Sequence, residues 1–225
     1  MNKTQKSKKA SPGIEFDHRL SRAAVGRLSL YLRRLEALLQ EGVGKVSSRQ
    51  LGESLGVPDT QVRKDLAPLG GLGHPGVGYA IPKLISAIRQ TLGIDREWTV
   101  ALVGVGNLAR ALLRYRGFRQ HGFRIVALFD ADPTKIGQQV DGLEIHDPAR
   151  MSQVIQATGA ELGLLTVPSE AAQKVADALV AAGVRGVLNF APVGLRLPSA
   201  VSLVSVDLTI QLEQLAFLVQ TRESK

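Results

Sequence analysis

Residues 100–118 read VALVGVGNLARALLRYRGF, and this stretch constrains the fold more than any other. Four apolar residues in a row predict a buried strand, two glycines predict a tight turn, and the apolar spacing that follows is typical of a helix. A strand that turns on glycines directly into a helix is the first half of a βαβ unit. We therefore expect a parallel sheet that is covered by helices.

The same alternation continues through residues 96–206. Apolar runs alternate there with helical patterns: WTVALVG, a helix at 107–116, RIVALFD, a weak segment around VDGLEIH, a helix at 148–157, LGLLTV, a helix at 169–182, RGVLNF and VSLVSV. This order is typical of an α/β fold. Because the runs are apolar throughout, their strands are expected to be buried on both faces. The sequence predicts a Rossmann-like, doubly wound parallel sheet.

The glycine turn has the position of a dinucleotide phosphate site, after a strand and at the start of a helix. In GVGNLA, Gly104 permits the tight turn, Gly106 lets the backbone approach a pyrophosphate, and Ala109 is an accepted variant of the third glycine. The N–H groups at the start of the helix favour an anion. The predicted phosphate-binding residues are Gly104, Val105, Gly106, Asn107 and Leu108. A glycine turn without a ligand is the alternative.

An acidic residue ends the second strand of this half. Asp130 follows Gly104 by 26 residues, close to the interval at which a carboxylate meets the adenosine ribose. Its charge would repel a 2′-phosphate, so NAD(H) is favoured over NADP(H). The alternative is a solvated carboxylate or a helix cap, a role that suits Asp132 better.

Residues 21–95 predict a different, mainly helical domain. Apolar spacing and the capping box SSRQ predict helices at 21–40, from residue 47, at 60–69 and at 82–92, and GGLGHPGVGYAI predicts a β-hairpin that would form a wing. Residues 1–95 hold 15 Lys and Arg against 8 Asp and Glu, whereas residues 96–225 hold 13 against 12. A basic helix-turn-helix with a wing points to a nucleic-acid partner. The alternative is a charge that only aids solubility.

Composition narrows the remaining chemistry. The chain has no cysteine, which excludes disulfides, thiolate metal sites and thiol redox switches, and its four histidines lack ligand spacing, so no metal is expected. Residues 1–20 are expected to form a disordered basic tail and not a targeting peptide. No apolar run reaches the length of a membrane span, so we expect a soluble, cytoplasmic protein.

The last helix, at residues 208–220, has two apolar faces. Leu208, Leu212 and Leu215 share one stripe, while Ile210 and Phe217 lie nearly opposite. Two such faces require cover on both sides. A partner subunit and burial within the chain's own domain are equally compatible with this pattern.

The predicted nicotinamide end of the site offers no catalytic group. It would be lined by the segments TVPSE and NFAPVG, at the carboxyl ends of two strands, with Thr166, Val167, Pro168, Asn189, Phe190, Ala191 and Pro192. None is a histidine, lysine or carboxylate that could serve hydride chemistry. Binding without turnover is expected. The alternatives are an NAD-dependent oxidoreductase with a nucleic-acid-binding appendage, and a nucleotide or coenzyme A module used for assembly.

Between about residue 21 and residue 218 a series of motifs follows in one order: LYLRRLE, SSRQLGESLGV, QVRKDL, GVGY, VGVGNLARAL, LFDADPTKIG, LLTVPSEAAQKVAD, GVLNFAPV and the VDL before the last helix. In these motifs the chain resembles the Rex family of redox-sensing transcriptional repressors. The resemblance implies an α/β protein with an all-α, winged-helix N-terminal domain at 21–95, a Rossmann NAD(H)-binding domain at 96–206, and a domain-swapped dimerisation helix at 207–225.

The resemblance also implies roles for single residues. The DNA-binding residues would be Ser48, Gln61, Arg63, Lys64 and, in the wing, His74. Tyr115 matches the family tyrosine near the nicotinamide, and Arg33 matches a first-helix arginine that pairs with Asp207 across the dimer. Their plainer alternatives are surface charges, a packed tyrosine and, for Asp207, a helix N-cap.

One departure concerns the wing. The family usually continues its recognition helix as SYFG and has a basic wing residue, whereas this chain has APLG and then GHPG. The altered wing puts the usual operator sequence or affinity in doubt.

The resemblance implies a homodimeric repressor that performs no reaction and binds operator DNA. It implies that the repressor is released from the DNA when NADH, and not NAD⁺, is bound.

Overall fold

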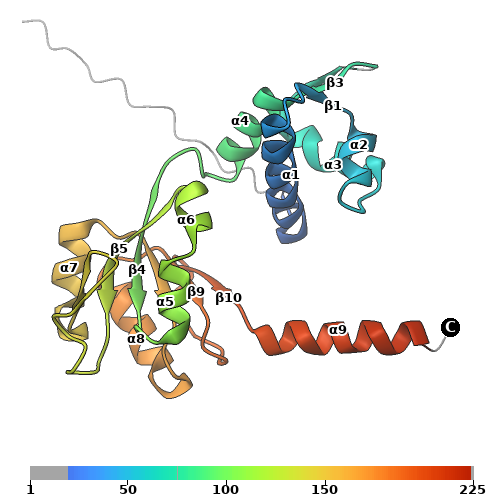
Figure 1. Cartoon of the computed structure of the whole chain (residues 1–225). Helices are drawn as coiled ribbons and strands as arrows, with labels where there is room; N and C mark the ends of the chain where they lie inside the picture. Colours follow the sequence, from blue (N-terminus) through green and yellow to red (C-terminus); the bar gives the residue numbers. More distant parts are fainter. Residues whose placement is uncertain (1–19, 75, 224–225) are drawn as a thin grey trace, which may run out of the picture. The chain divides into compact units, whose positions relative to one another are not determined.

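In the computed structural model, which describes residues 20–74 and 76–223, the chain forms two compact units that divide between Asp95 and Arg96 (Figure 1). Each unit is built around buried apolar residues of its own. The basic tail expected at residues 1–20 lies, except for Leu20, outside the described residues.

The N-terminal unit is a winged helix-turn-helix. Its helices are α1 (Arg22–Gln40), α2 (Ser48–Glu53), α3 (Asp59–Leu66) and α4 (Ile81–Thr91), and its antiparallel sheet has the order β1 (Lys45–Val46), β3 (Gly78–Ala80), β2 (Gly73–His74). The four predicted helices and the hairpin are confirmed, and β1 adds a third strand. The helix predicted through residue 69 ends at Leu66 and continues as the 3₁₀ turn η1 (Ala67–Leu69), because Pro68 has no N–H to donate.

The C-terminal unit contains the predicted parallel sheet. Its strands are β4 (Trp98–Val103), β5 (Phe123–Phe129), β6 (Gln139–Val140), β7 (Leu143–His146), β8 (Leu162–Leu165), β9 (Gly186–Asn189) and β10 (Ser202–Ser205). They lie in the order β10-β9-β8-β4-β5-β7-β6, and only β6 is antiparallel to its neighbour. Without β6 this is the doubly wound order, with the reversal between β4 and β8.

Helices cover both faces of this sheet. Alternate residues of β4 point to opposite sides: Val100 and Leu102 pack with α5 (Asn107–Leu113) and α6 (Arg116–Gln120), and Ala101 and Val103 with α7 (Met151–Thr158) and α8 (Ser169–Ala181). A short 3₁₀ turn, η2 (Pro148–Arg150), precedes α7. The helix predicted at 107–116 is divided into α5 and α6, because the extended backbone of Tyr115 interrupts it. The doubly wound architecture is thereby confirmed.

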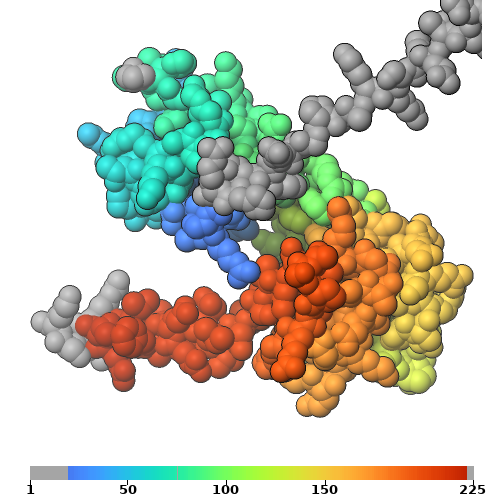
Figure 2. Space-filling view, turned by 180° about the vertical axis from the view of Figure 1, so that it is seen from behind, coloured from blue at the N-terminus to red at the C-terminus, as the bar shows by residue number. Residues whose placement is uncertain are grey.

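The last helix is α9 (Leu208–Glu223), and it is exposed wherever its side chains are described. From Leu208 to Thr221 every side chain is exposed, and Figure 2 shows this surface in red. Its exposed large apolar residues are Leu208, Ile210, Leu212, Leu215, Phe217, Leu218 and Val219. A helix of this length is marginal in water on its own, so its apolar residues require cover.

Candidate nucleic-acid interface and dinucleotide site

The helix-turn-helix is formed by local contacts that the sequence specifies. The Ser47 side chain accepts a hydrogen bond from the Gln50 backbone N–H (3.1 Å), and the Gln50 side chain accepts one from the Ser47 N–H (2.9 Å), so the predicted capping box starts α2. At Gly52 a Cβ atom would stand 2.3 Å from the Val57 carbonyl oxygen. Glycine therefore lets the turn pass close to α2 and brings α3 against it.

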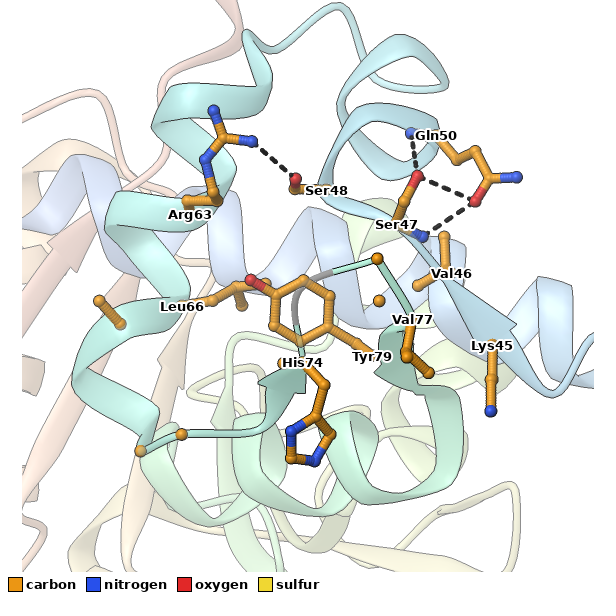
Figure 3. Close-up of a pocket in the computed structure, with 16 residues that line it drawn as sticks. Lys45, Val46, Ser47, Ser48, Gln50, Arg63, Leu66, His74, Val77 and Tyr79 are labelled. Carbon is orange, nitrogen blue, oxygen red and sulfur yellow. Dashed lines mark hydrogen bonds between the residues drawn. The ribbon is translucent and has the colours of Figure 1, made fainter.

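A groove of about 880 Å³ lies between α3, the start of α2 and the wing. Figure 3 shows Arg63 and Ser48 on one side of the groove, His74 on the wing, and the ring of Tyr79 between them. Three of the predicted DNA-binding residues, Ser48, Arg63 and His74, therefore line one concave surface.

Arg63 is held in place at the edge of this groove. Its Nη1 donates to Ser48 Oγ (3.1 Å) and to Asp59 Oδ2 (2.8 Å), while about half of its side chain stays exposed. The hydrogen bond from Arg63 lowers the pKa of the Asp59 carboxyl. Lys64, the next residue, is also exposed. The helix therefore presents two adjacent cations to solvent, one of them oriented.

Gln61 is directed away from the groove, into a buried cluster. Asp65 Oδ2 accepts from Arg27 Nε (2.6 Å) and Tyr31 Oη (2.9 Å), and Oδ1 accepts from Arg27 Nη2 (2.8 Å) and Gln61 Nε2 (2.7 Å). We call these four residues the α1–α3 hub. Arg27, Tyr31 and Asp65 were not predicted from the sequence. The signal was an acid inside an apolar stripe, between Val62 on α3 and Leu69 in the 3₁₀ turn η1.

The glycine turn has the geometry that a phosphate site requires. Gly104 has φ +92°, and a Cβ there would stand 2.7 Å from the Thr166 carbonyl oxygen and 2.8 Å from Val167 Cγ1. A Cβ at Gly106 would meet nothing within 4 Å. The first glycine is thus needed for the turn, and the second leaves open space beside the backbone that leads into α5 at Asn107 and Leu108.

Asp130 connects the glycine turn to the loop after β5. Its carboxylate accepts from the Val105 N–H (2.7 Å), the Asp132 N–H (2.9 Å) and Lys135 Nζ (3.0 Å). Burial opposes its ionisation, but these hydrogen bonds and the Lys135 charge hold its pKa below the usual value. Asp130 is therefore an ionised anchor for the turn, and the Val105 N–H is already used within the protein.

The other predicted cofactor residues lie at the carboxyl ends of β8 and β9. Thr166 Oγ1 donates to the carbonyl oxygens of Gly104 (2.8 Å) and Val103 (3.0 Å), which joins β8 to the glycine turn; Val167 and Pro168 follow it into α8. The fully buried Asn189 donates to the carbonyl oxygens of Ala191 (3.1 Å) and Val193 (3.0 Å). Its amide thus shapes the loop that carries Phe190, Ala191 and Pro192.

Tyr115, expected near the nicotinamide, and Arg33 and Asp207, expected to pair across a dimer, are all accessible in the single chain. Tyr115 is about half exposed and packs edge-on against Phe118, with ring centroids 5.3 Å apart. Asp207 Oδ1 accepts from the Thr209 N–H (2.8 Å), which is the helix-cap role that its sequence position predicts. Arg33 is exposed on α1 of the N-terminal unit. Tyr115 and Asp207 belong to the other unit.

The described residues form neither a metal-binding cluster nor a membrane-spanning helix. Among residues 20–74 and 76–223, no group of three or more His, Cys, Asp or Glu side chains is arranged to hold a metal ion. In the same residues, no helix combines the length and apolar character that crossing a membrane requires.

Comparison with known proteins gives matches along nearly the whole chain. The family described as "CoA binding domain" matches residues 95–193, and the one described as "Putative DNA-binding protein N-terminus" matches residues 19–67. The "Redox-sensing transcriptional repressor Rex" of Rhodopirellula baltica is 43% identical over 99% of this chain and 94% of its own length. The protein of the same name from Desulfitobacterium hafniense is 45% identical over 92% of this chain and 98% of its own.

Solved structures give the same result. The crystal structure of RSP in complex with beta-NAD⁺ and operator DNA matches with a TM-score of 0.86 and 34% identity, over 92% of this chain and 95% of that one. RSP is described as a Rex-family repressor. Its complex with beta-NADH matches with a TM-score of 0.83 and 33% identity, over 92% of this chain and 97% of that one.

Proposed function

Since this chain belongs to the Rex family of redox-sensing transcriptional repressors, we propose that it binds operator DNA as a homodimer and leaves it when NADH binds. It is a repressor and not an enzyme. The observation that carries the proposal is the presence, on one chain, of an exposed Arg63 beside the wing groove and a glycine turn with open space at Gly106.

The DNA-binding surface proposed here is the groove with Ser48, Arg63 and His74, together with the exposed Lys64 next to Arg63. Arginine can pair bidentately with a guanine edge, while lysine, serine and histidine side chains can donate hydrogen bonds to phosphates. The hydrogen bonds from Arg63 to Ser48 and Asp59 hold its guanidinium before DNA arrives, which lowers the entropy lost on binding. Gln61 supports this surface from behind.

We expect Arg63→Ala to lower operator affinity about 10- to 100-fold, because a bidentate base contact contributes about 1–3 kcal/mol. Arg63→Lys is the matched control, since it keeps the charge but loses the planar fork. Its affinity should lie between those of the wild type and the alanine variant, with weaker sequence discrimination. Fluorescence anisotropy with operator and scrambled duplexes measures both. Equal operator affinity of all three proteins would exclude Arg63 from recognition.

The cofactor proposed for the second unit is NADH, or NAD⁺ in the DNA-bound state. The residues present fit this cofactor. The turn at Gly104 and Gly106, with the backbone at Asn107 and Leu108, would bind the pyrophosphate. Asp130 lies at the end of β5, and the loops after β8 and β9 would face the nicotinamide. The bound nicotinamide would supply the redox signal, neutral when reduced and cationic when oxidised. The protein supplies binding and selectivity.

We expect Asp130→Asn to weaken NADH binding about tenfold and to narrow the preference for NADH over NADPH. An amide cannot accept from Val105, Asp132 and Lys135 as a carboxylate does, and it no longer repels a 2′-phosphate. Asp147→Asn is the control, because Asp147 only caps η2, where asparagine serves equally well. Titrations followed by nicotinamide fluorescence measure these affinities. Wild-type affinity and wild-type preference in Asp130→Asn would contradict the assignment.

The proposed organisation follows the family. Residues 21–95 form the DNA-binding domain, residues 96–206 the NAD(H)-binding domain, and residues 207–225 a helix that crosses to the partner subunit, with residues 1–20 as a basic tail. Arg33 would pair with Asp207 across the dimer near Tyr115. A dimer would present two α3 helices to the two halves of a pseudo-palindromic operator. We place this repressor in the cytoplasm, where its DNA target lies.

The experiment starts from an operator selected by the wild-type chain from a random duplex library. NADH and NAD⁺ are then titrated separately into the protein–DNA complex. Release by NADH at concentrations where NAD⁺ has little effect supports the proposal. Equal effects of the two nucleotides would contradict redox sensing, and a nucleotide module used only for assembly predicts that outcome.

A further inference from the structure

The α1–α3 hub lies directly behind the surface that carries Arg63 and Lys64. Only 3% of the Asp65 side chain is exposed, Tyr31 is fully buried, and about a quarter of the Arg27 side chain is exposed. Burial opposes ionisation of the Asp65 carboxyl, but hydrogen bonds from Arg27, Tyr31 and Gln61 hold its pKa below the usual value. Asp65 is therefore a buried carboxylate that accepts hydrogen bonds from three side chains, those of Arg27, Tyr31 and Gln61.

A hub of this kind is a poor device for stability alone. Removing an ion pair from water costs several kcal/mol per ion, and apolar side chains of similar volume are often as stabilising. The adjacent core already contains Val62 and Leu66, both buried. The hub differs from apolar packing because its hydrogen bonds are directional. Two hydrogen bonds from the Arg27 guanidinium and one from Tyr31 define a single position for the Asp65 carboxylate, whereas apolar contacts tolerate rotation and sliding of the helix.

Rotation of α3 would matter at its exposed face. A rotation of about 20° lies within the ordinary scatter of helix packing and would move the tip of an arginine side chain by about 3 Å. A hydrogen bond does not survive a displacement of that size. Arg63 and Lys64 precede Asp65 directly, so fixing Asp65 fixes the direction in which they leave the helix.

The hub also determines which way the side-chain amide of Gln61 is oriented. An ionised carboxylate can only accept, so the Gln61 amide nitrogen must face Asp65 and its oxygen Oε1 must point away. The donor group of Gln61 is thereby used within the hub. Instead of the predicted direct role in DNA binding, Gln61 would help to hold α3 in place, and only its acceptor oxygen could face outward.

We propose that the α1–α3 hub is a positioning device for operator recognition, in which Asp65, through Arg27 and Tyr31 on α1, holds α3 in the one rotation that aligns Arg63 with the bases. The inference rests on the proposed function and specifies how its DNA-binding surface is kept in register. It assigns to Asp65 operator discrimination and not the stability of the fold.

Two full-length variants test this. Asp65→Asn removes the charge with little change in shape, and the triple variant Arg27→Met, Tyr31→Phe, Asp65→Leu replaces the hub with apolar groups and leaves no buried charge unpaired. The control is Asp177→Asn, which alters an exposed carboxylate bonded to Gln173 Nε2 (2.8 Å) in the same i, i+4 arrangement, far along the chain on α8. Anisotropy gives the affinity ratio between the selected operator and a scrambled duplex, and circular dichroism with thermal unfolding reports the fold.

We expect the triple variant to be folded, to bind the scrambled duplex within about threefold of the wild type, and to lose at least tenfold in the affinity ratio. The affinity ratio between operator and scrambled duplex should also fall in Asp65→Asn, whereas Asp177→Asn should keep the wild-type ratio. A folded triple variant with the wild-type ratio would overturn the proposal. An unfolded triple variant would overturn it too, because the hub would then serve stability. All these binding measurements are made without nucleotide. If NADH failed to release the wild-type protein from its operator, the proposed function would be refuted, but the comparison of these variants would still be valid.

Discussion

Replacing Leu212 and Phe217 of α9 by glutamate is expected to convert the proposed dimer into a monomer of 24.1 kDa and to lower operator affinity about 100- to 10,000-fold. Both side chains are about two-thirds exposed in the single chain. If α9 crosses to a partner subunit, they become buried there, and two charges at such positions are costly. The affinity falls because a monomer binds one half-site without the effective concentration that a linked second half-site provides.

The matched control is Gln211→Glu with Gln214→Glu. This pair adds the same two charges to the same helix but removes no apolar side chain. Analytical ultracentrifugation reports the mass, and anisotropy reports operator binding. A dimeric Leu212→Glu, Phe217→Glu protein with wild-type operator affinity would show that α9 is not the dimer interface.

The second large effect is expected from Gly104→Ala, which should abolish measurable NADH binding and leave the protein on its operator at all NADH concentrations. The added Cβ would overlap the Thr166 carbonyl oxygen and Val167, and the positive φ at this position disfavours any L-residue. Relief of the overlap requires the glycine turn and the loop after β8 to separate. Both segments belong to the proposed cofactor site, so the variant should lose the site and, with it, the NADH-induced release from operator DNA.

Gly183→Ala separates the two causes. Gly183 has φ +99°, close to the φ of Gly104, but a Cβ there would meet nothing within 4 Å. Both variants should therefore lose about 1–2 kcal/mol of unfolding free energy from the backbone alone. Only Gly104→Ala should lose NADH binding, measured by fluorescence, and NADH-induced release, measured by anisotropy. Similar NADH affinities in the two variants would remove Gly104 from the cofactor site.

Features that depend on local pattern could be predicted from the sequence. The apolar runs gave the doubly wound sheet, and the S-x-x-Q box gave the start of α2 at Ser48. Gly104 and Gly106 differ in the structure as their positions in the motif predict, one crowded and one open. The two apolar faces of α9 were also visible in the spacing, but one chain cannot show what covers them.

Features that depend on contacts between distant residues could not be predicted. Arg27 and Asp65 are 38 residues apart, and nothing in the pattern of either helix indicates that their side chains meet. The sequence placed Asp130 near the ribose, but not its hydrogen bond to the Val105 N–H across the turn. Gln61 was assigned to DNA because it precedes Arg63 and Lys64, which match the DNA-reading helix of the family, whereas its amide donates to the buried carboxylate four residues on.

Operator DNA and NADH are expected to oppose each other's binding through one dimer. Thermodynamic linkage then requires that DNA weaken NADH binding by the factor by which NADH weakens DNA binding. The direct measurement is the dissociation constant of NADH by fluorescence titration, with the protein free and with it saturated by operator. We expect operator DNA to raise the dissociation constant of NADH by that same factor. An NADH affinity that operator leaves unchanged would contradict this expectation.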